Sequence, residues 1–144
     1  RDDDDDDSSF LNTVGVGSLR YMAPEVYRGD HYSHRADVYS FGIIFYELLF
    51  REHAWGALYG DAQLIARKAS HRMRPAVPKE WPREVVALVK ACWHPDPGAR
   101  PDFEEVARQL QDWRSSRAAK HILRRLAAGS RLGTLERWGL QSSI

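Results

Sequence analysis

Two glycines near the start of the chain have the spacing of a loop that binds phosphate groups. Gly15 and Gly17 begin a G-x-G pattern, which lets backbone N–H groups approach a phosphate closely when it follows a strand. Arg20 occupies the position of the third glycine, and the segment precedes a predicted helix without a strand-loop-strand context. We therefore assign no nucleotide-binding loop to this segment.

A single cysteine, Cys92, is the only residue of the chain suited to disulfide chemistry. Because it has no second cysteine to pair with, neither an internal disulfide nor a redox or metal role is expected, and no metal ligands are assigned. A lone thiol fits a reducing compartment, and we expect a cytoplasmic protein. Cys92 and its neighbour Trp93 are expected to pack in a core.

The charge of the chain is unevenly distributed. Its 144 residues carry a formal net charge of +1, with 43% hydrophobic and 28% charged residues, which is typical of one globular domain. An acidic run at 2–7 has no apolar residue and repels itself, so it is expected to be mobile. Basic residues gather toward the other end, at Arg114, Lys120, Arg124, Arg125, Arg131 and Arg137. No nucleic-acid motif accompanies them, so no nucleic-acid partner is expected.

The elements that must position these residues are predicted to be helical. Apolar periodicity and turn residues indicate helices at 24–28, 35–50, 62–69, 83–94 and after residue 102. Pro24 suits the first turn of the first helix, and Asp61 is expected to cap the third. Asp102 and Glu105 have the spacing of a capping box, in which each residue bonds the backbone of the other.

The helix predicted over 35–50 differs from the others because apolar residues occupy all of its sides. A helix of this kind is buried all round, so it needs neighbours on every face. It is interrupted by Glu47 and is too short to cross a bilayer, which takes roughly 20 apolar residues. Leaving even about 300 Å² of apolar surface in water forfeits on the order of 7 kcal/mol, so we expect poor solubility for the chain alone.

Three motifs of the chain resemble those of one protein family. They are GSLRYMAPE at 17–25, DVYSFG at 37–42 and CWHPDPGARPDF at 92–103. In this order and spacing they resemble the second half of a protein kinase catalytic domain, and most closely the tyrosine kinase-like group, whose members mostly phosphorylate serine and threonine. The resemblance implies a mainly α fold, the carboxy-terminal half of a kinase large lobe, flanked by an acidic segment and a basic tail.

The resemblance also implies roles for individual residues. Glu25 would close the activation segment as a buried carboxylate paired with Arg100. Ser18 and Tyr21 would belong to the loop that docks the protein substrate, although the Ser18 hydroxyl could equally cap a turn. Asp37 would support the catalytic loop by accepting hydrogen bonds from its backbone, and a plain acid at a helix start is compatible with this position.

The residues that transfer phosphate in this family have no counterpart in the chain. A kinase needs a lysine on a strand, a catalytic aspartate, and an asparagine and an aspartate for magnesium. Lys90 lies on a predicted helix with its side chain in solvent, the HRAD segment at 34–37 follows Ala-Pro-Glu instead of preceding it, and the only asparagine, Asn12, lies upstream of both. ATP and Mg²⁺ are thus implied for the intact kinase, and neither is expected to bind this fragment.

We therefore expect the carboxy-terminal fragment of a serine/threonine protein kinase, which begins within its activation segment and is inactive by itself. Its expected partners are a protein substrate and the missing amino-terminal part of its own kinase domain. The sequence is also compatible with a membrane anchor in that missing part. A non-catalytic binding or regulatory module derived from a kinase is the alternative.

The two ends of the chain flank the kinase-like part, so we divide the chain into regions 1–14, 15–113 and 114–144. Ser8, Ser9 and Thr13 are candidate regulatory phosphorylation sites, because a phosphate there would pair with arginines; an unmodified, solvated loop is the alternative. The tail can form a basic amphipathic helix. This helix would dock on its own lobe, on an acidic membrane surface or on an acidic protein partner, calmodulin.

Overall fold

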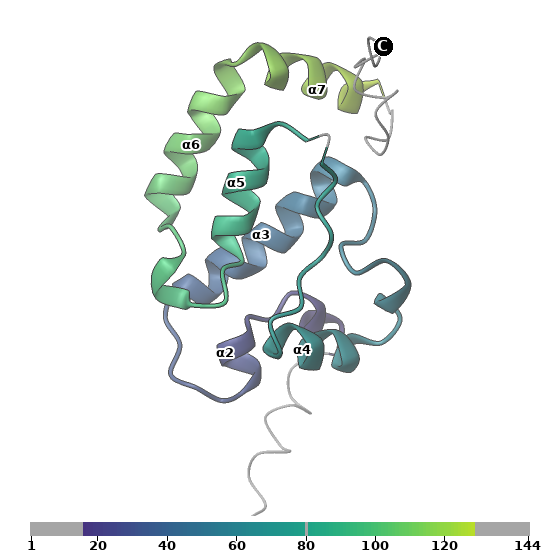
Figure 1. Ribbon diagram of the computed structural model, residues 1–144, viewed down its shortest axis with the longest axis vertical. Helices are drawn as coiled ribbons and strands as arrows, with labels where there is room; N and C mark the ends of the chain where they lie inside the picture. The colour runs from purple at the N-terminus through teal and green to yellow at the C-terminus, as the bar shows by residue number, and fades with distance from the viewer. Residues whose placement is uncertain (1–15, 80, 129–144) are drawn as a thin grey trace, which may run out of the picture.

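The computed structural model describes residues 16–79 and 81–128, which form a mainly helical fold (Figure 1). No strand lies within these two ranges, which confirms the expected fold class. The elements are η1 (Val16–Arg20), α2 (Pro24–Tyr27), α3 (Arg35–Phe50), η2 (Gly56–Leu58), α4 (Ala62–Ser70), α5 (Arg83–Cys92), η3 (Pro97–Ala99), α6 (Phe103–Ser115) and α7 (Arg117–Ala127). The acidic run 2–7, Ser8, Ser9, Thr13 and the tail beyond residue 128 lie outside the described residues.

The helices begin where the sequence offers capping groups. The Asp61 carboxylate accepts a backbone hydrogen bond in the first turn of α4, at 2.9 Å, as expected. At the start of α6, the Asp102 carboxylate accepts from the N–H of Glu105 at 2.8 Å. The reciprocal half of the predicted capping box is wrong, because the Glu105 carboxylate instead accepts hydrogen bonds from Arg108 and Gln109.

Helix α3 runs through the middle of the molecule, with α5 and α6 on one side and α2 and α4 below it in Figure 1. Its Tyr39 and Ile43 are fully buried and share a core cluster with Val89 of α5. Cys92 is also fully buried, in a second cluster between α3, α5 and α6. This confirms that Cys92 packs in the core, where burial raises the pKa of its thiol to about 12.

One side of α3 remains open to solvent. Ile44 is 45% exposed and Leu48 is 66% exposed, so in this chain the helix lacks a neighbour on one face and leaves apolar surface in water, as expected for the chain alone. The physical reason is that α5 packs against only one side of the helix, and Leu49 and Tyr46 lie there. Apolar side chains therefore remain in water on the opposite side.

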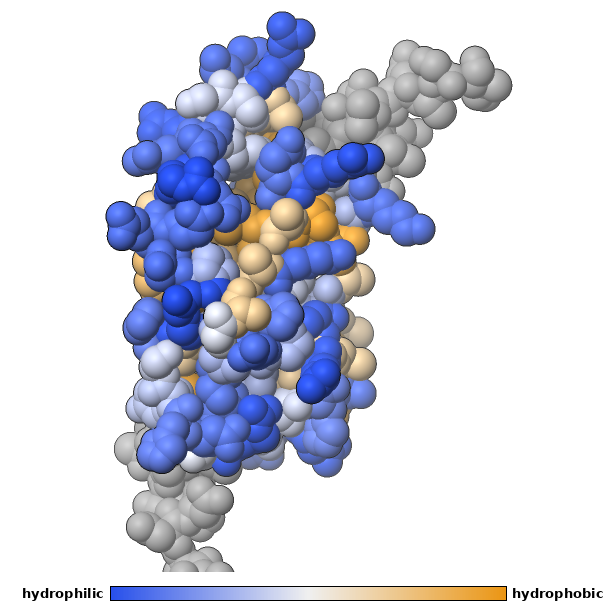
Figure 2. All heavy atoms as spheres, turned by 60° about the vertical axis from the view of Figure 1, so that its left-hand side comes forward, coloured by the Kyte–Doolittle hydropathy of each residue, from blue (hydrophilic) through white to orange (hydrophobic). Residues whose placement is uncertain are grey.

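Helix α7 docks on the lobe from which it extends. Its Ala119 and Ile122 are buried, and Ile122 joins the same core cluster as Tyr46. The basic residues Lys120 and Arg124 point to solvent. For the part of the tail that the structure describes, docking on its own lobe is therefore the observed arrangement. Figure 2 shows the α6 side of the molecule, where hydrophilic residues surround a smaller hydrophobic area.

Candidate functional site

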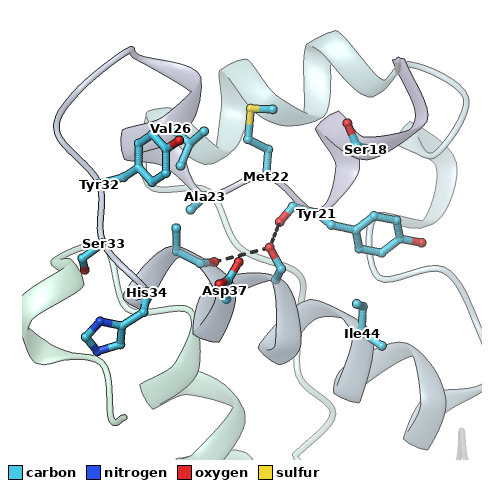
Figure 3. Close-up of a pocket in the computed structure, with 12 residues that line it drawn as sticks. Ser18, Tyr21, Met22, Ala23, Val26, Tyr32, Ser33, His34, Asp37 and Ile44 are labelled. Atoms are coloured by element: carbon cyan, nitrogen blue, oxygen red, sulfur yellow. Dashed lines mark hydrogen bonds between the residues drawn. The ribbon is translucent and has the colours of Figure 1, made fainter. Parts of the chain in front are cut away.

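The segment that follows η1 is held in place from two directions. Ser40 of α3 donates a hydrogen bond through Oγ to the carbonyl oxygen of Tyr21, at 2.8 Å (Figure 3). From the other side, Trp55 Nε1 donates to the carbonyl oxygen of Arg20 at 3.2 Å, and Arg20 Nε donates to the carbonyl oxygen of Tyr59 at 2.6 Å. The Arg20 guanidinium also lies 4.3 Å from the centre of the Tyr59 ring. These contacts fix the backbone of the predicted docking loop against α3 and η2.

The side chain of Tyr21 is fixed by a carboxylate of α3. Its Oη donates a hydrogen bond to Glu47 Oε2 at 3.0 Å, while Glu47 Oε1 accepts from the N–H of Ala54 at 2.9 Å. Burial, and then the hydrogen bond to Glu47, raise the pKa of the Tyr21 phenol, so the phenol stays protonated and remains a donor. No role for Glu47 is predicted from the sequence. Its isolation as the one charged residue within the apolar run was the signal that could have identified it.

Ser18, Tyr21 and Asp37 line one groove of about 550 Å³ (Figure 3). The groove opens between the loop before α2 and the first turns of α3, and Ile44 lies at its edge. Ser18 and Asp37 are both exposed there. The structure thus brings three of the site residues predicted from sequence into one hollow.

A second groove adjoins the first at Tyr21. It has a volume of about 750 Å³ and is lined by Tyr21, Ile44, Glu47, Leu48 and His53, among others. Tyr21 and Ile44 belong to both grooves, so the two hollows form a continuous surface along the exposed side of α3. Its lining combines apolar, acidic and basic side chains.

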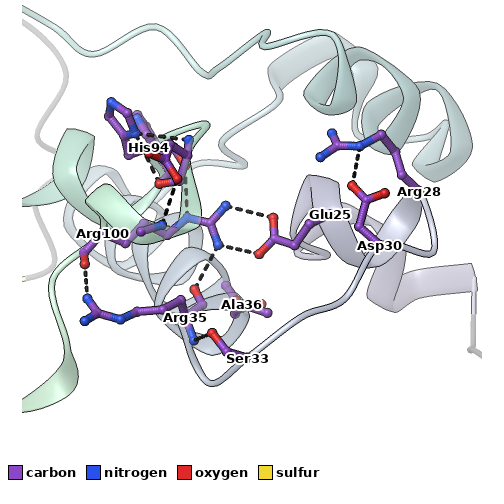
Figure 4. Close-up of polar contacts among 12 residues, drawn as sticks. Glu25, Arg28, Asp30, Ser33, Arg35, Ala36, His94 and Arg100 are labelled. Carbon is purple, nitrogen blue, oxygen red and sulfur yellow. Dashed lines mark hydrogen bonds and ion pairs between the residues drawn. The ribbon is translucent and has the colours of Figure 1, made fainter.

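Glu25 and Arg100 form a buried pair away from these grooves (Figure 4). Arg100 Nη1 and Nη2 donate to the two Glu25 oxygens at 2.6 and 2.8 Å, and both side chains are almost fully buried. Arg100 also donates through Nε to the carbonyl oxygen of His94 at 2.9 Å and through Nη1 to that of Arg35 at 2.9 Å. Arg35 in turn donates to the carbonyl oxygen of Arg100. The pair therefore ties α2 to the start of α3 and to the segment before α6.

No group of three or more histidine, cysteine, aspartate or glutamate side chains that could hold a metal ion occurs within residues 16–79 and 81–128. Lys90 is exposed on α5, as predicted. None of the described helices combines the length and the apolar character required to cross a membrane.

Comparison with known proteins agrees with this geometry. The family described as protein tyrosine and serine/threonine kinase matches residues 1–110. A probable serine/threonine-protein kinase of Dictyostelium discoideum is 38% identical over 100 residues, which cover 69% of this chain and 11% of that protein. The dual specificity protein kinase shkA of the same organism is 31% identical over 96 residues, or 67% of this chain and 18% of that protein.

A human relative supports the same assignment. Mitogen-activated protein kinase kinase kinase 7 of Homo sapiens is 37% identical over 96 residues, which cover 67% of this chain and 16% of that protein. The chain thus spans 11–18% of the length of these three relatives. It is a partial kinase catalytic domain, and it belongs to the protein tyrosine and serine/threonine kinase family.

Proposed function

We propose that this chain forms the substrate-docking part of the large lobe of a serine/threonine protein kinase. In the intact protein it would hold a protein substrate while ATP, with Mg²⁺, supplies the phosphoryl group. The chain lacks the lysine, catalytic aspartate and magnesium ligands of the family, so the 144 residues by themselves would not transfer phosphate. ATP, Mg²⁺ and a protein substrate are inferred for the intact enzyme from its family membership.

The observation that carries this proposal is the fixed geometry of the loop that contains Ser18 and Tyr21. Its backbone is bonded to Ser40 and Trp55, and its tyrosine is bonded to Glu47. A loop with a fixed backbone lowers the entropy cost of holding a substrate hydroxyl in position. Positioning, together with electrostatic stabilisation, supplies most of the catalysis of phosphoryl transfer. Ser18 is exposed at the groove, where its hydroxyl would help to admit serine or threonine.

Asp37 would support the catalytic loop from the opposite side of the same groove. Its carboxylate is exposed, and no hydrogen bond to it occurs within the described residues. Backbone N–H groups of a preceding segment would supply the missing donors. Glu25 and Arg100 would act at a distance, because their pairing fixes where α2 begins and hence where the docking loop ends.

The amino-terminal part of the kinase domain would cover the exposed side of α3. Ile44 and Leu48 leave apolar surface in water beside the two grooves. Burying such surface contributes about 25 cal/mol per Å², so an apolar partner there is favoured. The regulatory role of Ser8, Ser9 and Thr13, the cytoplasmic location and the division at residues 14 and 113 remain predictions.

The test is a phosphorylation assay of the intact protein with serine, threonine and tyrosine peptides. We expect serine and threonine peptides to be phosphorylated, Ser18→Ala to lower kcat/KM for them, and Ser18→Thr to restore it because the hydroxyl returns. Gln111→Ala, on the exposed surface of α6, is the matched control and should change nothing. Equal activity on tyrosine peptides would contradict the specificity. No activity in an intact protein that is correctly folded would favour the non-catalytic binding module.

A further inference from the structure

A basic groove lies between α2, the end of α4 and the segment that follows α5. It has a volume of about 490 Å³, and its charged lining consists of Arg28, Arg72, Arg74, His94 and Asp96. Figure 4 shows Arg28 and His94, which come from two segments far apart in the sequence. Three arginines face one aspartate, so the groove carries an excess of positive charge.

The arginine charges are only partly neutralised. Arg72 is exposed, and no ion pair among the described residues includes its side chain. Arg28 uses Nε to bind Asp30 at 2.8 Å on the surface, which leaves the other two guanidinium nitrogens outside that pair. Arg74 donates through Nε to the carbonyl oxygen of Trp93 at 2.7 Å, and its buried Nη2 has no hydrogen-bond partner.

The acidic group of the groove is already engaged in local structure. Asp96 Oδ1 accepts a hydrogen bond from the N–H of Gly98 at 2.9 Å, where it caps η3. The N–H of Asp96 in turn donates to His94 Nδ1 at 3.1 Å. Asp96 therefore does not pair with the arginines, and the positive charge of the groove remains available to an anionic ligand.

We propose that this groove binds the acidic run of the same chain, residues 2–7. The run offers six consecutive carboxylates, the chemistry that exposed guanidinium groups pair with most strongly. Element η1 packs against α4, where Leu19 clusters with Ala62 and Ala66, and Ala69 and Ser70 at the end of the same helix line the groove. Along the axis of α4, η1 therefore lies within about 12 Å of the groove. The residues between 7 and 16 reach up to about 30 Å when extended, so the run has ample length to enter the groove.

Such an interaction would be electrostatic and intramolecular. It should weaken as salt rises, because charges at a surface are screened over about 10 Å at 0.1 M ionic strength. The covalent link would raise the effective concentration of the run near the groove to the millimolar range. Docking of the run would hold the start of the chain against the α2 and α4 face, away from the groove of Ser18 and Asp37.

Disulfide trapping in the intact protein tests this proposal. A protein that carries Asp5→Cys and Ser70→Cys places one thiol in the run and one at the groove, and Asp5→Cys with Gln111→Cys is the reference pair on α6. Cys92 does not interfere, because it is fully buried. We expect the groove pair to close roughly tenfold faster than the reference pair at low salt, in a reaction independent of protein concentration.

Proximity to η1 alone would favour the groove pair, so charge reversal is the decisive comparison. Arg28→Glu with Arg72→Glu should remove the salt-sensitive part of the trapping rate. Lys120→Glu with Arg124→Glu changes the net charge equally at α7 and should leave the rate unchanged. Circular dichroism would verify that both variants are folded. The proposal would be overturned by a trapping rate that depends neither on salt nor on the groove arginines. A rate that rises with protein concentration would also overturn it.

Discussion

Two ion pairs of this fold differ sharply in how much they contribute to its stability. Arg100 and Glu25 are desolvated, with exposed side-chain fractions of 0% and 4%, and each satisfies the other with two hydrogen bonds. Arg108 forms comparable contacts with Glu105 on the surface, where its side chain is 60% exposed. Water and side-chain entropy reduce the value of an exposed pair to about 0–1 kcal/mol, whereas a buried charge without a partner is costly.

Removal of one member of the buried pair should therefore destabilise the protein severely. We expect Arg100→Met to lower the free energy of unfolding by about 3–5 kcal/mol, because it leaves the Glu25 carboxylate buried and unpaired. Urea denaturation of the intact protein measures this change. Arg108→Met is the matched control and should have a much smaller effect, because water screens that pair. Similar losses for the two variants would show that the Glu25 pair is more hydrated than its burial indicates.

The Cys92 thiol provides a pH-dependent prediction. Burial raises its pKa from 9.0 to about 12, so the folded state holds the proton more tightly than the unfolded state does. This contribution to stability is complete below pH 9 and is lost as the pH rises toward 12. At pH 8 we expect the thiol of the folded protein to react with a disulfide reagent only after denaturant is added. Rapid reaction of the folded protein would show that the α3 and α5 contact opens readily.

At the scale of elements, the approach of α3 to α5 depends on one glycine. A Cβ built on Gly42 would lie 2.8 Å from Cys92 Cβ, a separation that real Cβ atoms essentially never show. The obstruction is the first atom of a side chain in the core, so it cannot rotate away. The two helices can stay this close only while residue 42 lacks a side chain.

Gly42→Ala tests that dependence. The added methyl group should force α5 outward and lower the melting temperature, with a loss of stability of about 1–3 kcal/mol, because overpacked cores carry this cost. Gly60→Ala is the control, since a Cβ at Gly60 would meet nothing within 4 Å. Calorimetry of the two variants compares them directly. An unchanged melting temperature for Gly42→Ala would mean that the helices separate at little cost.

Sequence reasoning succeeded for the elements because their signals are local. The bounds of α3, the caps at Asp61 and Asp102 and the buried stripe of α5 all follow from periodicity and capping chemistry within a few residues. The Glu25 and Arg100 pair joins residues 75 positions apart, and it was expected only through the family resemblance. The Tyr21 bond to Glu47 and the basic groove could not be predicted, because no local pattern indicates which loops meet in space.

At the scale of the whole molecule, the distribution of apolar surface decides how the chain behaves in solution. Ile44 and Leu48 lie one helical turn apart on α3, and both are exposed beside the two grooves. Met73, in the segment between α4 and α5, and Leu123 of α7 are 43% and 42% exposed. Single exposed apolar residues are ordinary on protein surfaces, whereas adjacent ones on a hollow surface mark a contact site.

Replacement of the two adjacent residues should therefore have opposite effects in two contexts. In the isolated 144-residue chain, Ile44→Gln with Leu48→Gln should raise the concentration reached before aggregation, because it removes an exposed apolar surface. In the intact protein the same change should lower the melting temperature, because the preceding part of the kinase domain would bury both side chains. Each replacement would then remove about 1.5–3 kcal/mol of stabilisation from apolar burial. Met73→Gln with Leu123→Gln is the control and should have little effect in either context. Light scattering and calorimetry measure the two outcomes, and an unchanged melting temperature of the intact protein would show that this side of α3 is not covered by the rest of the domain.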